Sequence, residues 1–154
     1  MAIHVNWAYK AEAEPIWLTE IQRAAAQTLR HGGYEPDAVD VVILLTDRAT
    51  VHALNRQYRG YDKPTDVLAF PDGSHDPETG RPYLGDVVIA VPVAAEQAQQ
   101  AGHTLADELC LLTVHGVLHL LGYDDQEPQA RARMWAQQGA ILQELACRAT
   151  MPPL

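Results

Sequence analysis

The stretch over residues 105–121 constrains the fold more than any other part of the chain. Its leucine and valine residues recur all around the turns of a helix and are not confined to one face. A helix that is apolar on all sides is buried at the centre of a domain. Thr104 is a suitable N-cap for it, and Gly122 ends the pattern. We therefore expect the other elements to pack around this helix.

Periodicity and turn signals predict the elements that surround it. Strands are expected over residues 2–8, 38–46, 65–70 and 83–91. Further helices are expected over residues 15–29, 48–57, 92–101 and 128–147. The strand over 38–46 is almost continuously apolar, which is typical of a strand buried on both faces. The turn-rich segment 71–80 predicts a long hairpin tip between the last two strands.

Length and composition indicate one ordinary globular domain. The chain has 154 residues, with 47% apolar and 20% charged residues. We expect the domain to cover residues 1–150 and a loose tail to cover 151–154. The sequence has neither a membrane-length apolar run nor the basic, then apolar, start of a secretory signal. Two isolated cysteines, Cys110 and Cys147, are typical of buried free thiols in a reducing compartment, so we expect a cytoplasmic protein.

The charge balance limits which partners the chain can bind. Eleven Lys and Arg residues against twenty Asp and Glu residues leave a formal net charge of −9. Bulk electrostatics therefore oppose general nucleic-acid binding, and RNA would need a local basic patch. One candidate patch combines four cations with the single acid Asp62, although a solvated helix and loop face would have the same composition. Its cations are Arg48, Arg56, Arg59 and Lys63.

Two histidines near the end of the central helix form a candidate metal site. His115 and His119 are four residues apart and so share one helix face. Gly122 permits a left-handed turn that can carry Asp124 or Asp125 back over the pair. Two histidines and one carboxylate leave a fourth position open for water, which is the pattern of a catalytic zinc. The other five histidines lack ligand spacing and are expected at the surface or in loops.

A zinc peptidase helix would carry a glutamate directly after the first histidine, as its general base. This chain has Gly116 at that position, so a peptidase is the weaker interpretation. Arg59 has the planar donor fork that suits a phosphate. Asp66 and Asp86 are expected to form capping or turn hydrogen bonds.

The chain resembles a known family, the YbeY family of bacterial metal-dependent endoribonucleases, over nearly its whole length. Four motifs carry the resemblance: Leu54-Asn55 with Tyr58-Arg59, Pro64-Thr65-Asp66-Val67-Leu68-Ala69-Phe70-Pro71, Leu84-Gly85-Asp86-Val87-Val88-Ile89, and His115-Gly116-Val117-Leu118-His119-Leu120-Leu121-Gly122-Tyr123-Asp124.

The resemblance implies an α+β fold, a single compact domain in which a small mixed sheet of about four strands packs with about five helices. It also implies a metal site at the C-terminal end of the central helix. The implied activity is hydrolysis of single-stranded RNA in the maturation of the small-subunit ribosomal RNA 3′ end and in ribosome quality control. Small-subunit proteins are implied partners, and neither DNA nor a membrane is expected. The family's arginine corresponds to Arg59, which would face the substrate phosphate.

One departure from the family concerns the third metal ligand, which is usually a histidine. This chain has Asp125 there. A carboxylate can replace imidazole on zinc, but it makes the ion less Lewis acidic and favours harder ions. The expected cofactor is one Zn²⁺ per chain, held by His115, His119 and Asp125, with another divalent ion as the alternative.

The expected mechanism is metal-assisted phosphodiester hydrolysis, with Arg59 neutralising charge on the phosphate. Asp124 is a candidate general base, and the nucleophile is either water or the ribose 2′-hydroxyl. Two other functions stay open. One is a non-catalytic ribosome-assembly factor with a structural metal, and the other is a zinc peptidase-like hydrolase.

Overall fold

A computed structural model describes residues 3–149, and the expected tail at 151–154 lies outside the described residues. Within 3–149 the chain forms four strands and five α-helices, joined by two short helical segments. The strands are β1 (Ile3–Trp7), β2 (Asp40–Thr46), β3 (Val67–Pro71) and β4 (Tyr83–Ala90). The helices are α1 (Pro15–His31), α2 (Arg48–Leu54), α3 (Val91–Ala101), α4 (Leu105–Leu120) and α5 (Pro128–Glu144), with η1 (Pro36–Ala38) and η2 (Asn55–Arg59). The expected α+β class is confirmed.

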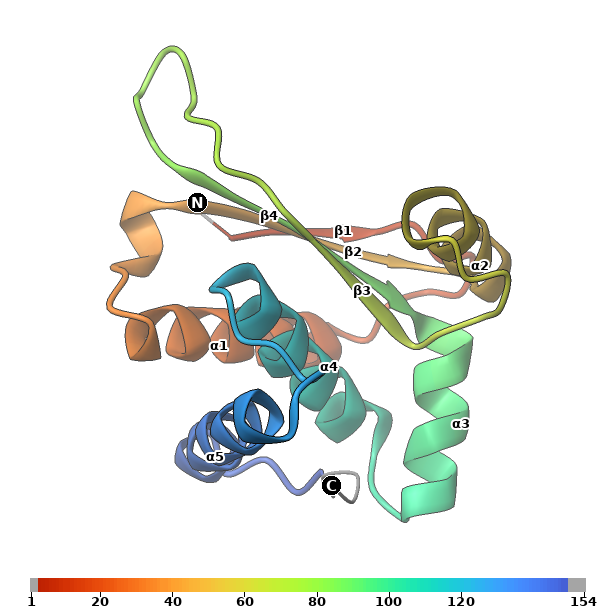
Figure 1. Cartoon of the computed structure of the whole chain (residues 1–154). Coiled ribbons are helices and arrows are strands. Elements are labelled where there is room, and N and C mark those ends of the chain that lie inside the picture. Colours follow the sequence, from red (N-terminus) through yellow and green to blue (C-terminus); the bar gives the residue numbers. More distant parts are fainter. Residues whose placement is uncertain (1–2, 150–154) are drawn as a thin grey trace.

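The four strands form one mixed sheet in the order β1-β2-β4-β3. β1 and β4 both run parallel to β2, whereas β3 pairs with β4 in the antiparallel direction. The β3–β4 connection is the expected hairpin, and its long tip projects from the body of the molecule (Figure 1). β3 is thus an edge strand, and one side of it stays available to the cavity described below.

Helix α4 occupies the centre of the domain, as its sequence predicts. It lies with α1 against one face of the sheet, and α5 covers the side of these helices that faces away from the sheet (Figure 1). Apolar side chains of α4 enter two core clusters, one shared with the sheet and α1 and one shared with α5. Among the helices of residues 3–149, none combines the length and apolar content needed to cross a membrane.

The second face of the sheet is only partly covered, which corrects one expectation about β2. Val41, Ile43 and Leu45 are fully buried, but Val42 and Leu44 on the opposite face are half-buried. The reason is that the short helix α2 covers this face at one end only (Figure 1). The apolar side chains of β2 are therefore fully buried on the face that packs against α1 and α4, and only half-buried on the other.

The helix expected over 48–57 changes its winding partway along. Regular α-helix ends at Leu54, and the chain continues as the π-helical turn η2 up to Arg59. Gly60 then takes a left-handed conformation, with φ of 76°, and the chain leaves the helix. Arg59 is the last residue of this wider turn and lies directly before the loop that leads to β3. π-helical turns of this kind often occur at functional sites.

Candidate metal centre

The structure brings together the two histidines and one of the two aspartates that the sequence singles out. His115 Nε2 and His119 Nε2 are 3.2 Å apart, and Asp125 Oδ2 lies 3.8 Å from each of them. Bonds of about 2.0–2.1 Å to a tetrahedral zinc would separate its ligand atoms by about 3.3 Å. The three side chains therefore fit a single metal ion with little adjustment.

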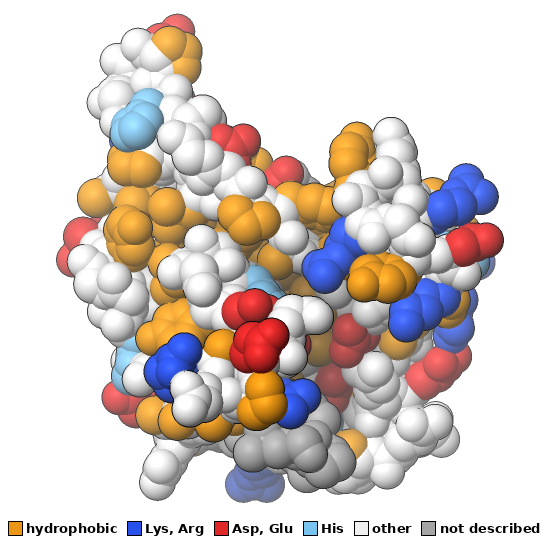
Figure 2. Space-filling view, in the orientation of Figure 1, with side chains coloured by type: hydrophobic (Ala, Val, Ile, Leu, Met, Phe, Trp, Pro, Cys, Tyr) orange, Lys and Arg blue, Asp and Glu red, His pale blue; other side chains and the backbone are white. Residues whose placement is uncertain are grey.

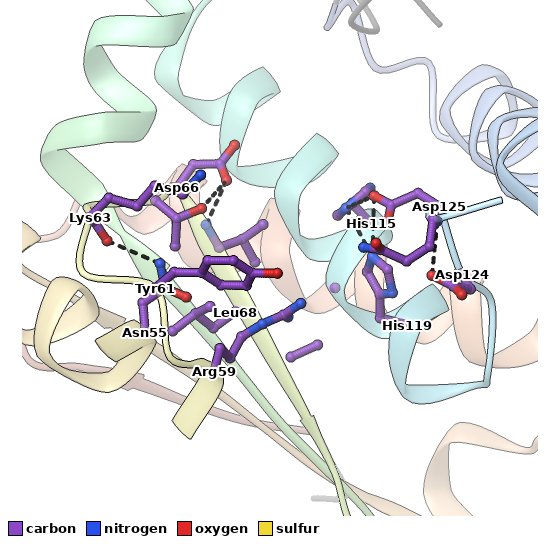
Figure 3. A pocket seen from close by; sticks show the side chains of 15 residues that line it. Asn55, Arg59, Tyr61, Lys63, Asp66, Leu68, His115, His119, Asp124 and Asp125 are labelled. Carbon is purple, nitrogen blue, oxygen red and sulfur yellow. Dashed lines mark hydrogen bonds and ion pairs between the residues drawn. The ribbon is translucent and has the colours of Figure 1, made fainter. Parts of the chain in front are cut away.

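The turn after α4 decides which aspartate joins the histidines. Gly122 has a φ of 98°, and the N–H of Tyr123 donates to Leu118 O at 3.0 Å, so the chain reverses over the end of the helix. Asp125 then points back toward the histidine pair (Figure 3). Asp124 is exposed, and its Oδ1 accepts a hydrogen bond from the Gln126 N–H at 3.0 Å. Residue spacing alone left both aspartates open, and the geometry favours Asp125, the residue that the family resemblance also implied.

A residue that sequence reasoning missed orients the first histidine. Gln138 on α5 is fully buried, and its Oε1 lies 3.0 Å from His115 Nδ1. A carbonyl oxygen at this position accepts a hydrogen bond from the Nδ1–H, which leaves the Nε2 lone pair directed at the metal position. Gln138 is one of several polar residues in α5 and lies 23 positions after His115, so the sequence gave no signal of this role.

The second histidine lies in an environment that keeps it neutral. Burial lowers the pKa of His119, and the neighbouring His115 lowers that pKa further. Asp125, Asp124 and the Tyr123 backbone oppose this shift without reversing it. A metal binds imidazole only in its neutral form, so the lowered pKa of His119 favours metal binding down to a more acidic pH.

The histidines and Asp125 line a cavity of about 690 Å³ that also receives side chains from the η2 segment and β3. Arg59, Tyr61 and Lys63 extend into it from the side opposite the histidine pair (Figure 3). Asn55 holds this side in place, because it is 3% exposed and its Nδ2 donates to Lys63 O at 3.0 Å. The cavity thus has a metal-ligating wall and a cationic wall.

The expected basic patch divides between the cavity and the outer surface. Arg59 and Lys63 line the cavity, whereas Arg48 and Arg56 do not. Arg48 instead pairs with Glu96 on α3, at 2.6 Å between Nη2 and Oε1. Figure 2 shows basic side chains gathered on one side of this face, over the α2–η2 segment, with acidic ones nearer the centre. Of the four cations, Arg59 and Lys63 are therefore the two that belong to the cavity.

A chain of polar contacts runs from the cavity wall into the interior. Asp66 lines the cavity, and its Oδ1 accepts the Val67 N–H at 2.8 Å, which is the expected capping bond. The Gln97 amide, oriented with its nitrogen toward the carboxylates, donates to Asp66 Oδ2 at 3.2 Å and to Glu108 Oε2 at 3.0 Å. Glu108 in turn contacts His103, at 2.5 Å between Oε1 and Nε2.

His103 lies in the loop between α3 and α4, as expected for a surface or loop residue, but its side chain is buried. Its side chain is only 4% exposed, because the residue precedes α4 and its ring folds back onto Glu108 in the first turns of that helix. Asp86, the other aspartate expected in a local hydrogen bond, accepts one from the Tyr83 hydroxyl.

Comparison with known proteins gives consistent matches. The family model described as Endoribonuclease YbeY matches residues 6–146. A protein of Pelotomaculum thermopropionicum named Endoribonuclease YbeY is 44% identical over 128 residues, covering 81% of this chain and 84% of the relative. A protein of the same name from Roseiflexus castenholzii is 47% identical over 129 residues, covering 80% of each chain.

The fold also matches a solved structure. The solution structure of a Thermotoga maritima protein superimposes with a TM-score of 0.60 at 26% sequence identity. The match covers 93% of this chain and 88% of the other.

Proposed function

Because the chain belongs to the YbeY family of endoribonucleases, we propose that it is a metal-dependent endoribonuclease that cuts single-stranded RNA. We propose further that it acts on the 3′ end of small-subunit ribosomal RNA and in ribosome quality control. One observation carries the proposal. A single cavity has a His-His-Asp group on one wall and the cations Arg59 and Lys63 on the other. This arrangement suits a phosphodiester, because a metal ion can contact one of its oxygens while the side-chain cations neutralise the charge on the others.

His115, His119 and Asp125 would hold one divalent ion, with Zn²⁺ as the first candidate. When bound, such an ion polarises a water molecule or a phosphate oxygen. Gln138 would keep the His115 ring in the orientation that directs Nε2 inward. Because Asp125 carries a negative charge, the site is also suited to harder ions than a three-histidine site would be.

Arg59 would contact the phosphate through its planar fork and neutralise charge that develops during cleavage. Lys63 would add a second cation at the same wall, and the exposed Arg56 would lie along the strand outside the cavity. We leave Arg48 out of the RNA path, because it is engaged by Glu96. Asp124 is the proposed base for the attacking group, either water or the ribose 2′-hydroxyl, because it lines the cavity outside the ligand group.

This function implies a cytoplasmic location and contact with the small ribosomal subunit or its proteins, and we propose both. Family membership favours RNA hydrolysis over the two other interpretations, the non-catalytic assembly factor and the peptidase-like hydrolase. The peptidase interpretation also lacks its glutamate, since position 116 is glycine.

The test is cleavage of a labelled single-stranded RNA by the wild type and by His119→Ala, purified in parallel, with and without added Zn²⁺. The parallel preparation controls for contaminating ribonuclease, and a DNA strand of the same sequence controls for specificity. Cleavage by the wild type alone is expected. Equal cleavage by both proteins, or by neither at any metal load, would contradict the proposal and favour the assembly-factor function.

A further inference from the structure

The cavity contains an aromatic side chain that the proposed chemistry does not use. We propose that Tyr61 is a stacking platform for one base of the bound RNA strand, next to the phosphate that is cleaved. This inference rests on the proposed RNA substrate and adds to it a residue that binds a base and not the backbone.

The exposure of Tyr61 is the first observation behind this role. Its side chain is 53% exposed, although it belongs to the wall of a cavity. Tyr34 and Tyr58 are also exposed in the described part of the chain, but neither lines the cavity. Tyr58 packs its ring edge-on against Phe70, with centroids 5.6 Å apart. Tyr61 is therefore the tyrosine that is both accessible and directed at the site.

The backbone of Tyr61 is held in place while its ring is exposed. Its N–H donates to Asn55 O at 3.3 Å, and Asn55 also binds Lys63 O on the other side of the loop. Two contacts to one buried residue thus anchor the loop at Tyr61 and again at Lys63. A ring carried by an anchored backbone loses less conformational freedom when a ligand stacks on it than a ring on a mobile loop would.

The groups around the ring suit a nucleotide. Lys63 Nζ lies 5.4 Å from the centroid of the Tyr61 ring, and Arg59 extends beside the ring in the same direction (Figure 3). The hydroxyl end of the ring points across the cavity toward His115 and Asp125 (Figure 3). Because Lys63 Nζ lies over one face of the ring, a base would stack on the other face. Proteins bind single strands by combining aromatic rings, on which any base can stack, with cations that contact the phosphates.

The test measures binding of short fluorescent single-stranded RNAs by anisotropy, using the full chain after metal removal so that no strand is cut. In a set of RNAs, each base in turn is replaced by an abasic ribose. At one position, loss of the base is expected to weaken wild-type binding by about tenfold. The same loss should leave binding by Tyr61→Ala unchanged, because the stacking partner is already missing.

Two further variants separate stacking from structural effects. Tyr61→Phe keeps the ring and should bind like the wild type, whereas Tyr61→Ala should raise Kd for the intact RNA by about tenfold. Tyr34→Ala removes another exposed ring, which lies outside the cavity, and should bind like the wild type. Thermal melting followed by circular dichroism checks that each variant is folded.

Two results would overturn the inference. One is Tyr61→Ala binding every RNA as the wild type does, and another is base removal costing both proteins the same. If the metal-loaded wild type still cuts RNA in either case, the proposed function stands and only the stacking role fails. If the wild type neither binds nor cuts RNA, both fail together.

Discussion

Gly116 of α4 lies directly against Val87 of β4. A Cβ atom built on this glycine would be 2.5 Å from Val87 Cγ1 and 3.0 Å from Val87 Cγ2. The helix can approach the sheet this closely only because the residue after His115, the first of the proposed metal ligands, has no side chain. The same contact explains why the position cannot carry the glutamate of a zinc peptidase. The side chain would have to occupy the space that Val87, itself fully buried, already fills.

This contact predicts that Gly116→Ala destabilises the fold. In an unobstructed helix the substitution would stabilise by up to about 1 kcal/mol, because alanine has the higher helix propensity. Here overpacking should outweigh that gain and lower the free energy of unfolding by about 1–3 kcal/mol. Urea denaturation measures the difference. Gly73→Ala, with nothing within 4 Å of the added Cβ, is the matched control and should stay close to the wild type.

A second variant tests whether the contact itself causes the loss. When Val87→Ala is added to Gly116→Ala, the loss of stability should be smaller than the sum of the two single losses, since the alanine at position 87 lacks the atoms that clash. Losses that simply add in the double variant would contradict this explanation.

His119→Ala should abolish stoichiometric metal binding. It removes one of three ligand side chains and leaves His115 and Asp125, which cannot complete a site with two positions vacant. Metal content per chain after dialysis against Zn²⁺ measures the effect. His52→Ala, which removes a histidine paired with Asp62, serves as the control and should bind metal as the wild type does. One metal per chain in His119→Ala would show that the ligands are assigned incorrectly.

Gln138→Leu should weaken metal binding without removing any ligand. Loss of the acceptor for His115 Nδ1 frees the imidazole to rotate, and changes of this kind reduce metal affinity by about 10- to 100-fold. Gln138→Glu keeps an acceptor oxygen at the same place and should retain affinity. Competition with a chromogenic chelator measures both variants. Equal affinity in the leucine variant and the wild type would argue against an orienting role.

Glu108 predicts a pH dependence of stability. Burial raises the pKa of this carboxyl above its ordinary 4.5, and the hydrogen bond from His103 opposes that shift only in part. The folded state then binds the proton more tightly than the unfolded state. The resulting stabilisation is complete below pH 4.5 and is lost as the pH rises through the raised pKa.

Glu108→Gln cannot titrate, so the comparison isolates this effect. The free energy of unfolding of the wild type, relative to this variant, should fall as the pH rises from 4.5. Urea denaturation at a series of pH values measures it, with Asp66 and His103 left in place as the neighbouring titratable groups. Parallel pH curves for the two proteins would rule out the assigned shift.

Arg59→Ala should lower kcat/KM for RNA cleavage by about 100-fold, the usual effect of removing one preorganised donor from a developing charge. Arg59→Lys should recover only part of this, because an ammonium group lacks the bidentate fork. Arg30→Ala removes an exposed arginine that does not line the cavity, and it should cleave at the wild-type rate. Full activity in Arg59→Lys would mean that charge alone suffices.

Local patterns in the sequence predicted much of this protein. Helical periodicity and the Thr104 cap located the central helix, and the four-residue spacing of His115 and His119 predicted their common face. Gly122 has the positive φ that we expected from its position directly after the helix. These features depend on neighbours within a few turns of one chain segment, so the order of residues carries them directly.

Only the packing of distant elements decided the rest. Asp125 rather than Asp124 faces the histidines because of how the reversed turn lies over α4, and Gln138 reaches His115 because α5 packs beside that helix. For residues on different elements, the number of positions between them in the sequence does not determine how far apart they lie in the fold. A sequence can thus specify which chemical groups are present, whereas the docking of helices and strands determines which of them meet.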